Sequence, residues 1–153
     1  MEQARKELNY FFVTIFNQIL SWEEQSFKSM GLEGITLREL HVIEAVFQLK
    51  EKGENRMSQI ARYLAITPGS LTTAVNCLVK KGYLKRESAP GDRRVIMIEP
   101  TEIAKEANDI HSEYHSRMIN FIADGLSGAE ADLLKKVLEK VGKYFAESAN
   151  TRS

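Results

Sequence analysis

One stretch, residues 57–99, constrains the fold more than any other part of this chain. Two short helical patterns come first, and turn-forming residues at Ile66-Thr67-Pro68 separate them. Two apolar, β-like runs follow over residues 83–88 and 95–99, and the connection Ala89-Pro90-Gly91-Asp92 favours a tight turn. A helix, a turn, a second helix and a hairpin in this order predict a winged helix-turn-helix.

The second helix of this unit has clear start and stop signals. Thr67 is a good N-cap, Pro68 fits the first helical position, and Gly82 ends the helix after residue 81. Winding the helix at about 100° per residue gathers its apolar side chains on one face; these are Leu71, Ala74, Val75 and Leu78. The opposite side, called the polar face below, carries Ser70, Thr72, Thr73, Asn76 and Lys80. Short hydroxyls and an amide suit base edges and phosphates, so we expect this face to contact DNA.

Basic residues gather in the same stretch. Residues 56–94 hold eight lysines and arginines and two acids, whereas the whole chain has a formal net charge of zero. A basic centre between acidic flanks is typical of a surface that contacts phosphates. At the tip of the hairpin, Arg93 and Arg94 can reach the DNA minor groove, and Asp92 is expected to hold an arginine or the turn. Lys80, Lys81, Lys85 and Arg86 are the candidate phosphate contacts.

The flanking segments predict long helices. Apolar residues recur at three and four over residues 2–30, and their arc is wide enough to bury more than one side, which indicates a partner chain. A capping box of Thr36 and Glu39 begins the next helix, Ser58 is expected to cap the third, and helices over residues 101–124 and from Ser127 onward follow. We therefore expect a mostly α fold with a small β-wing. Residues 1–153 form one domain, residues 36–100 the DNA-binding unit, and residues 1–35 and 101–150 dimerisation helices.

Composition and the absence of certain motifs argue against other classes of protein. No apolar run is long enough to cross a bilayer and the first residues lack a signal-peptide core, so we expect a cytoplasmic protein. The single cysteine, Cys77, excludes an intrachain disulfide and is expected to be buried or half-buried. There is no HExxH, GxSxG or phosphate-binding glycine loop, so we expect no enzyme and no cofactor required for DNA binding. A winged helix used only for protein contact is an alternative, but the polar face and the arginine-rich tip argue against it.

Two motifs, TPGSLTTAVNCLVKKGYLKR and GDRRVIMIEPT, resemble the MarR family of bacterial winged-helix regulators, and the resemblance covers nearly the full chain. It implies a homodimer that binds a pseudo-palindromic operator on double-stranded DNA, as a repressor that a ligand or an oxidant releases. It also implies groove contacts for Ser70, Thr72, Thr73 and Asn76, a minor-groove role for Arg94, and a bracing role for Asp92.

Further motifs, IFNQIL-x-x-EE, ITLRELHVIEAV and ADGLSGAE, resemble the branch of this family that represses fatty-acid synthesis with acyl-acyl-carrier protein as corepressor. That resemblance implies an apolar tunnel for an acyl chain. The candidate lining consists of apolar side chains of the first helix and of the turn after it: Phe12, Phe16, Leu20, Trp22, Phe27 and Met30. These residues also fit a plain dimer core, and release by small aromatic or lipophilic compounds is an alternative.

The three histidines of the chain form a second candidate site. His111 and His115 are four residues apart and share one face of a helix, which is a spacing that can chelate zinc. His41 together with Glu23 or Glu24 could complete a tetrahedral set. Glu23, His41, His111 and His115 also match the ligands of the zinc-responsive branch of the MarR family. The other interpretation is a group of hydrogen-bonded polar residues beneath the DNA-binding unit.

Overall fold

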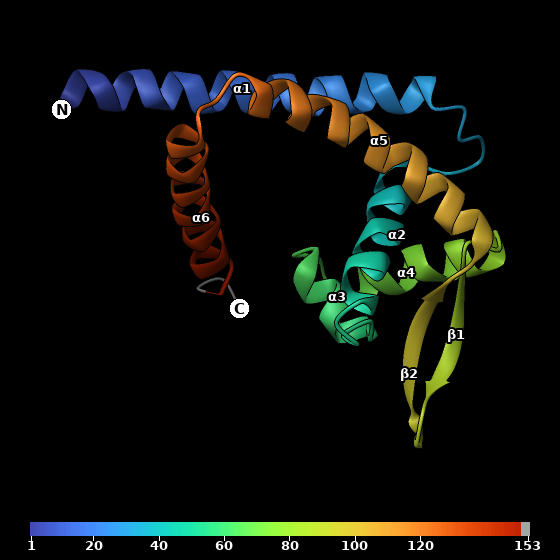
Figure 1. Ribbon diagram of the computed structural model, residues 1–153. Helices are drawn as coiled ribbons and strands as arrows, with labels where there is room; N and C mark the ends of the chain where they lie inside the picture. The colour runs from blue at the N-terminus through green and yellow to red at the C-terminus, as the bar shows by residue number, and fades with distance from the viewer. Residues whose placement is uncertain (151–153) are drawn as a thin grey trace.

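The computed structural model describes residues 1–150 of the chain, with side chains through residue 147. Two long helices and a terminal helix surround a small unit of three helices and a hairpin (Figure 1). The elements are α1 (Glu2–Ser29), α2 (Leu37–Lys50), α3 (Met57–Tyr63), α4 (Pro68–Lys80), β1 (Leu84–Ala89), β2 (Asp92–Pro100), α5 (Glu102–Asp124) and α6 (Gly128–Asn150). The predicted mostly α fold with a small β-wing is confirmed.

Local capping signals define most helix starts. The Thr36 side chain accepts from the backbone N–H of Glu39, whose carboxylate accepts from the N–H of Thr36 in return. Thr67 caps α4 through the N–H of Ser70. The prediction that Ser58 caps α3 is wrong, because the helix begins one residue earlier, at Met57, and its N-cap residue is the extended Arg56.

A single apolar core joins α2, α3, α4 and the base of the hairpin. Its most deeply buried side chains include Leu40, Ile43, Val46, Ile60, Leu71, Val75, Leu78, Leu84 and Ile98. Each helix contributes the stripe that its periodicity predicts, so the opposite surface of α4 stays outside the core. The small residues Ala104 and Ala107 let α5 lie close against this unit.

The two strands form an antiparallel hairpin that projects from the core (Figure 1). The hairpin is longer than predicted, because Ala89 pairs with Asp92 and the turn itself is confined to Pro90 and Gly91. Gly91 has φ +85°, a conformation that L side chains rarely adopt. Asn55 fixes the base of the hairpin, since its carbonyl accepts from the N–H of Ile98 and its side chain donates back to the Ile98 carbonyl at 2.8 Å.

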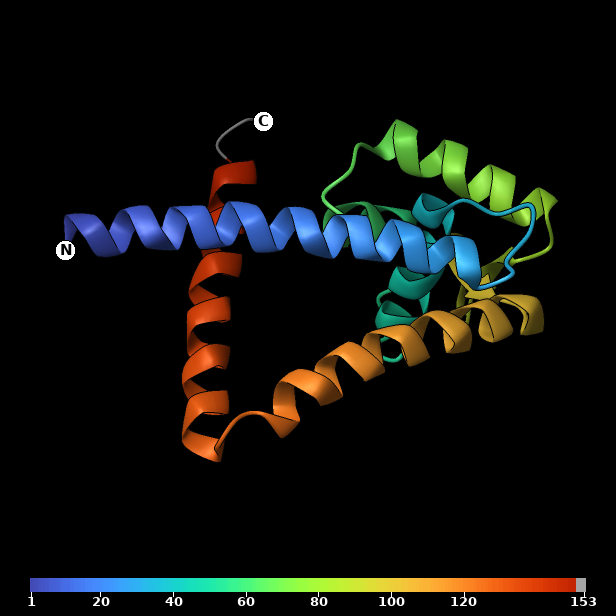
Figure 2. The ribbon, with the colours of Figure 1, turned by 90° about the horizontal axis from the view of Figure 1, so that it is seen from above.

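The long helices leave much apolar surface uncovered. Viewed from above, α1 and α5 extend away from the winged unit and diverge from each other, and α6 passes beneath the N-terminal half of α1 (Figures 1 and 2). Phe11, Phe16, Phe121, Leu133 and Phe145 are all more than half exposed in the single chain. Among the described residues, no helix is long and apolar enough to cross a membrane.

Candidate nucleic-acid interface

Helix α4 exposes most of the residues predicted for DNA contact. Its buried side, with Leu71, Val75 and Leu78 at 0% exposure, faces the core. Thr72, Thr73, Asn76 and Lys80 are exposed, whereas Ser70 is half-buried beside the Thr67 cap. The helical phase predicted from the sequence is therefore the one that the packing adopts.

The two threonine hydroxyls have a defined direction. Thr72 Oγ1 donates to the carbonyl of Pro68 at 2.9 Å, and Thr73 Oγ1 donates to the carbonyl of Gly69 at 3.1 Å. A hydroxyl has one hydrogen, so each oxygen now offers lone pairs to a ligand.

The tip of the hairpin presents the predicted arginines. Arg93 is exposed, and the Arg94 side chain is 91% exposed. Asp92 Oδ1 accepts from the backbone N–H of Arg94 at 3.0 Å and from its Nε at 3.2 Å. These hydrogen bonds lower the pKa of the Asp92 carboxyl. The expected contact between Asp92 and an arginine is present, and it leaves the guanidinium facing outward.

Not every basic residue of this region is available to a phosphate. Lys81 Nζ donates to both carboxylate oxygens of Glu39, at 2.7 and 2.8 Å, and Lys85 pairs with Glu87 on the same strand. Arg86 Nη2 donates to Asn76 Oδ1 at 2.7 Å. The spacing of charges along the chain gave no sign of the partners of Lys81 and Arg86, because these partners belong to other elements. Glu87, in contrast, lies two residues from Lys85 on the same strand.

Glu39 ties the end of α4 to the start of α2. Its side chain is 10% exposed and also accepts from the backbone N–H of Thr36. Burial raises the pKa of Glu39, but hydrogen bonds from Lys81 and Thr36 outweigh that effect, and the pKa is lowered overall. The ionised carboxylate therefore holds the C-terminal end of the candidate recognition helix in place.

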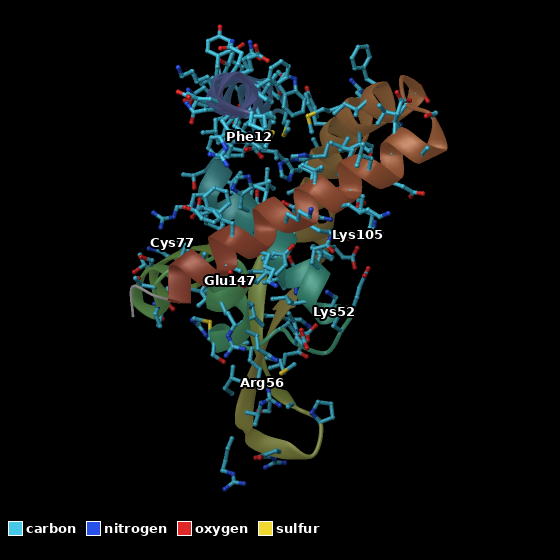
Figure 3. All side chains as sticks on the ribbon, turned by 90° about the vertical axis from the view of Figure 1, so that its left-hand side faces the viewer. Phe12, Lys52, Arg56, Cys77, Lys105 and Glu147 are labelled. Atoms are coloured by element: carbon cyan, nitrogen blue, oxygen red, sulfur yellow. The ribbon has the colours of Figure 1, made fainter. Side chains whose placement is uncertain are left out.

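Cys77 lies on the outer flank of α4 and is exposed (Figure 3). The expectation of a buried or half-buried cysteine is wrong. The buried arc of α4 is narrow, and none of the described elements covers the side of the helix on which Cys77 lies.

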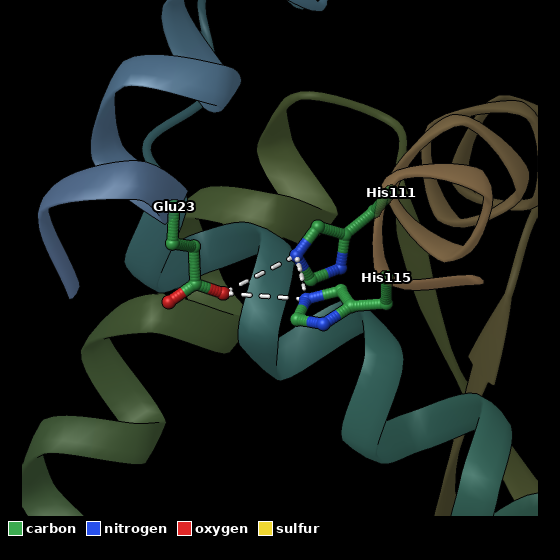
Figure 4. Close-up of side chains that lie close together, drawn as sticks. All are labelled: Glu23, His111 and His115. Carbon is green, nitrogen blue, oxygen red and sulfur yellow. Dashed lines mark hydrogen bonds and ion pairs between the residues drawn. The ribbon is translucent and has the colours of Figure 1, made fainter. Parts of the chain in front are cut away.

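The structure places ligand atoms of Glu23, His111 and His115 within 4.8 Å of one another, and His41, the fourth predicted ligand, contacts this group through Glu23. Glu23 Oε1 lies 2.8 Å from His41 Nε2 and 3.4 Å from the Nε2 atoms of both His111 and His115 (Figure 4). The Nε2 atoms of His111 and His115 are 3.0 Å apart. The exposed Glu24 instead forms an ion pair with Lys28. Three helices, α1, α2 and α5, thus contribute donors to one cluster, which is called the histidine cluster below.

The histidine cluster is partly sealed from water. His111 is 1% exposed, and burial lowers its pKa, which favours the neutral imidazole that binds metals. Burial raises the pKa of Glu23, but the contacts with the histidines lower this pKa by more than burial raises it. Glu23 is therefore a carboxylate at neutral pH. His111 Nδ1 is buried without a hydrogen bond, and the nearest carboxylate oxygen, from Glu44, lies 3.6 Å away.

An apolar cavity of about 520 Å³ lies between α1 and α5. Its lining includes Ile15, Ile19 and Trp22 from α1, and Tyr114, Arg117, Met118 and Phe121 from α5. Of the six residues predicted to line a ligand pocket, Trp22 alone belongs to this cavity. Arg117 lies 5.7 Å from the centre of the Tyr114 ring and is the cationic group of the lining.

The other predicted pocket residues lie elsewhere. Phe12, Phe16 and Leu20 are exposed and do not belong to the cavity lining, and the side chains of α1 radiate in all directions when the helix is viewed along its axis (Figure 3). Phe27 packs against the core of the winged unit, and Met30 is half-buried after the end of α1. The periodicity of the sequence could not have separated the two sets, because Phe12, Phe16 and Leu20 have the same four-residue spacing as Ile15 and Ile19.

Comparison with known proteins supports the architecture. Residues 35–96 match the MarR family model. The chain is 27% identical to the HTH-type transcriptional regulator YkoM of Bacillus subtilis, over 92% of this chain and 89% of that protein. It is 28% identical to the HTH-type transcriptional regulator MhqR of the same species, over 86% and 88% of the two chains.

A solved structure is similar over almost the whole length. Streptococcus pneumoniae FabT, crystallised in complex with DNA, aligns with a TM-score of 0.79 and 27% sequence identity, over 94% of this chain and 98% of that one. The likeness therefore extends to the terminal helices, beyond the segment that the family model matches.

The contact between Glu39 and Lys81 predicts a pH-dependent stability. Because the pKa of Glu39 is lower in the folded chain than in the unfolded chain, its contribution is present at neutral pH and is lost as the pH falls through the folded pKa. We expect Glu39→Gln to lower the free energy of unfolding by about 1–3 kcal/mol at pH 7. The deficit should shrink on acidification from about pH 5 to pH 3, measured by urea denaturation.

The exposed Glu33→Gln is the matched control and should follow the wild-type protein at each pH. A deficit for Glu39→Gln that does not change with pH would contradict an ionised Glu39 in the folded state.

Proposed function

We propose that this chain is a MarR-type winged helix transcriptional regulator, as its matches to the MarR family model and to solved DNA-binding regulators suggest, and that it is a homodimeric repressor that binds a pseudo-palindromic operator. Each protomer inserts α4 into the major groove and directs the hairpin tip toward the flanking minor groove. The observation that supports this most directly is the exposed polar face of α4 beside the exposed arginines of the hairpin.

The proposed residue roles follow from exposure and contact. Thr72, Thr73 and Asn76 face the bases, with Ser70 at the start of the helix and Lys80 near the phosphates. Arg93 and Arg94 approach the minor groove, whose negative potential attracts guanidinium groups. Asp92 orients Arg94 through the hydrogen bonds described above.

The dimer proposal rests on the uncovered apolar surface. Exposed aromatic and aliphatic side chains follow α1, the end of α5 and all of the described part of α6. Exposed apolar surface that extends over the helices at both ends of a chain is typical of an obligate interface. A two-fold pair of these helices would present two α4 helices to half-sites one helical turn apart.

Substitutions in the interface test the DNA proposal. Arg94→Ala is expected to weaken operator binding and to reduce the slope of log affinity against log salt by about one unit, because one cationic contact is lost. Thr73→Ala and Asn76→Ala are expected to relax the preference at individual base pairs, at a cost of about 1–3 kcal/mol each. Fluorescence anisotropy with labelled duplexes at several salt concentrations measures both effects.

Lys6→Ala, which removes an exposed charge near the far end of α1, is the control and should leave binding unchanged. Unchanged binding in Arg94→Ala, Thr73→Ala and Asn76→Ala together would refute the proposed interface. Sedimentation of the wild-type protein should give twice the mass of one chain.

We further propose that the effector is an acyl chain delivered by acyl-acyl-carrier protein, so that the regulator controls fatty-acid synthesis. The apolar cavity between α1 and α5 supports this, since its walls are aromatic and aliphatic and Arg117 provides a cation beside them. Small aromatic or lipophilic compounds are the other chemistry that such a cavity suits.

Trp22 gives a direct readout of the cavity, because it is the single tryptophan of the chain and lies in the lining. Palmitoyl-acyl-carrier protein should shift its fluorescence emission, whereas acyl-carrier protein without an acyl chain should not. Ile19→Glu places a charge in the cavity and is expected to weaken binding by at least about tenfold.

Ser21→Glu, on an exposed side of α1, is the matched control and should bind as the wild-type protein does. Equal emission shifts with the acylated and unacylated carrier would argue against acyl recognition. A response to small aromatic compounds alone would favour the other effector class.

The histidine cluster supports a second candidate function, a zinc-responsive regulator. Three imidazole nitrogens and one carboxylate oxygen form a donor set that suits tetrahedral Zn²⁺. Glu44, close to the buried Nδ1 of His111, is suited to orient that ring as a second carboxylate. Zinc bound there would link α1 and α5 to α2 and so could change the spacing of the two α4 helices.

Zinc titration by calorimetry, followed by metal analysis of the gel-filtered protein, tests this function. The wild-type chain should retain one zinc per protomer at micromolar concentrations. Glu23→Gln should lose most of the affinity because it removes one of four ligands, whereas Glu24→Gln should retain it, since Glu24 is exposed and pairs with Lys28. Absence of retained metal in the wild-type protein would refute the zinc proposal.

A further inference from the structure

The contact between Arg86 and Asn76 joins the hairpin to the polar face of α4. Alternate residues of a strand share one side, so Arg86 points the same way as Leu84, which is buried in the core beside α4. Arg86 also pairs in register with the buried Ile98, which fixes its position along the strand. From this place its guanidinium reaches Asn76, with 2.7 Å between Nη2 and Oδ1.

The chemistry of the two groups fixes the orientation of the amide. A guanidinium has five N–H donors and no acceptor, so only the oxygen of Asn76 can form this hydrogen bond. The Asn76 Nδ2 group, with two N–H donors, is then the part that remains for a ligand. We propose that Arg86 is a positioning residue that converts Asn76 into a hydrogen-bond donor toward DNA, and that this decides which bases Asn76 accepts.

The inference rests on the proposed DNA binding and specifies which bases Asn76 contacts. An unconstrained asparagine contacts adenine through two hydrogen bonds, accepting from N6 and donating to N7. Arg86 occupies one of the two lone pairs of Asn76 Oδ1 and fixes the plane of the amide, so this contact disfavours the bidentate pair with adenine. Asn76 can donate to bases that present acceptors at the major-groove edge, which are guanine through O6 and N7, and thymine through O4.

The neighbouring threonines have the opposite hydrogen-bonding role, as acceptors. Thr72 and Thr73 donate their single hydroxyl hydrogens to carbonyls of the previous turn. Toward DNA they present oxygen lone pairs and methyl groups, which suit the amino groups of cytosine and adenine and the methyl group of thymine. The polar face of α4 thus combines acceptors at Thr72 and Thr73 with a donor at Asn76.

Selection from a randomised duplex library, with the full-length chain, tests this assignment. The wild-type protein defines the preferred site, and Asn76→Ala identifies the base pair at which the preference is lost. We expect guanine or thymine at that position in the wild-type selection. Arg86→Met, which removes the donors and keeps much of the aliphatic length, is expected to raise the share of adenine there by about fivefold or more.

Lys85→Met is the matched control. It removes the same charge from the adjacent residue of β1, whose side chain pairs with Glu87 rather than with α4. It should lower affinity similarly for all sequences and leave the base preference unchanged. The melting temperatures of both variants should stay close to that of the wild-type protein, because both contacts are exposed.

Three results would overturn the inference. One is a wild-type preference for adenine at the Asn76 position. Another is an Arg86→Met variant that loses affinity uniformly without a change of base, which would make Arg86 a phosphate contact only. The third is an Asn76→Ala variant that keeps every preference. A wild-type protein that selects no sequence at all would instead refute the proposed function itself.

Discussion

The packing of one side of α4 against the core is the constraint on which the rest of the structure depends. Leu71, Val75 and Leu78 are fully buried against α2 and the hairpin base, and this fixes the rotation of the helix about its own axis. A rotation of one residue, about 100°, would expose these side chains and bury hydroxyl and amide groups without partners. The apolar face therefore determines what the opposite face can present.

Partly buried polar contacts fix the position of α4 along its axis and the position of the hairpin. Glu39 holds Lys81 at the end of α4, so the helix cannot slide along the core without separating a partly buried ion pair. At the hairpin base, Asn55 bonds to Ile98 and Glu99, and Glu99 pairs with Lys50 at the end of α2. Helix and hairpin are thus attached to the same scaffold helix, α2, which maintains their relative position.

The regions proposed for regulation lie where α1 and α5 approach the scaffold. The histidine cluster links α1 and α5 to α2, and the apolar cavity lies farther along the same two helices. Trp22 connects the two regions, since it lines the cavity and its ring centre lies 6.1 Å from that of His115. Helix α2, which contributes His41 to the cluster, also packs against α4 and α5.

The sequence by itself determined the features that depend on local order. Helix periodicity, the capping residues Thr36 and Thr67, and the turn at Pro90 and Gly91 predicted the elements and the outward residues of α4, because these signals act within a few residues. Ser58 was misjudged because serine is a favoured N-cap residue and arginine is not, whereas the helix begins after Arg56, whose backbone N–H donates to the side chain of Gln59. The exposure of Cys77 could not be predicted, since it depends on which elements cover the flank of α4.

Only the tertiary structure decided which distant residues meet. It selected Glu23 over Glu24 for the histidine cluster, and Ile15 and Ile19 rather than Phe12 for the cavity wall. It also brought Arg86 to Asn76, ten residues away across a turn and a change from helix to strand. Pairings of this kind depend on crossing angles and strand register. Those are set by the packing of the whole core, and no local pattern in the sequence encodes them.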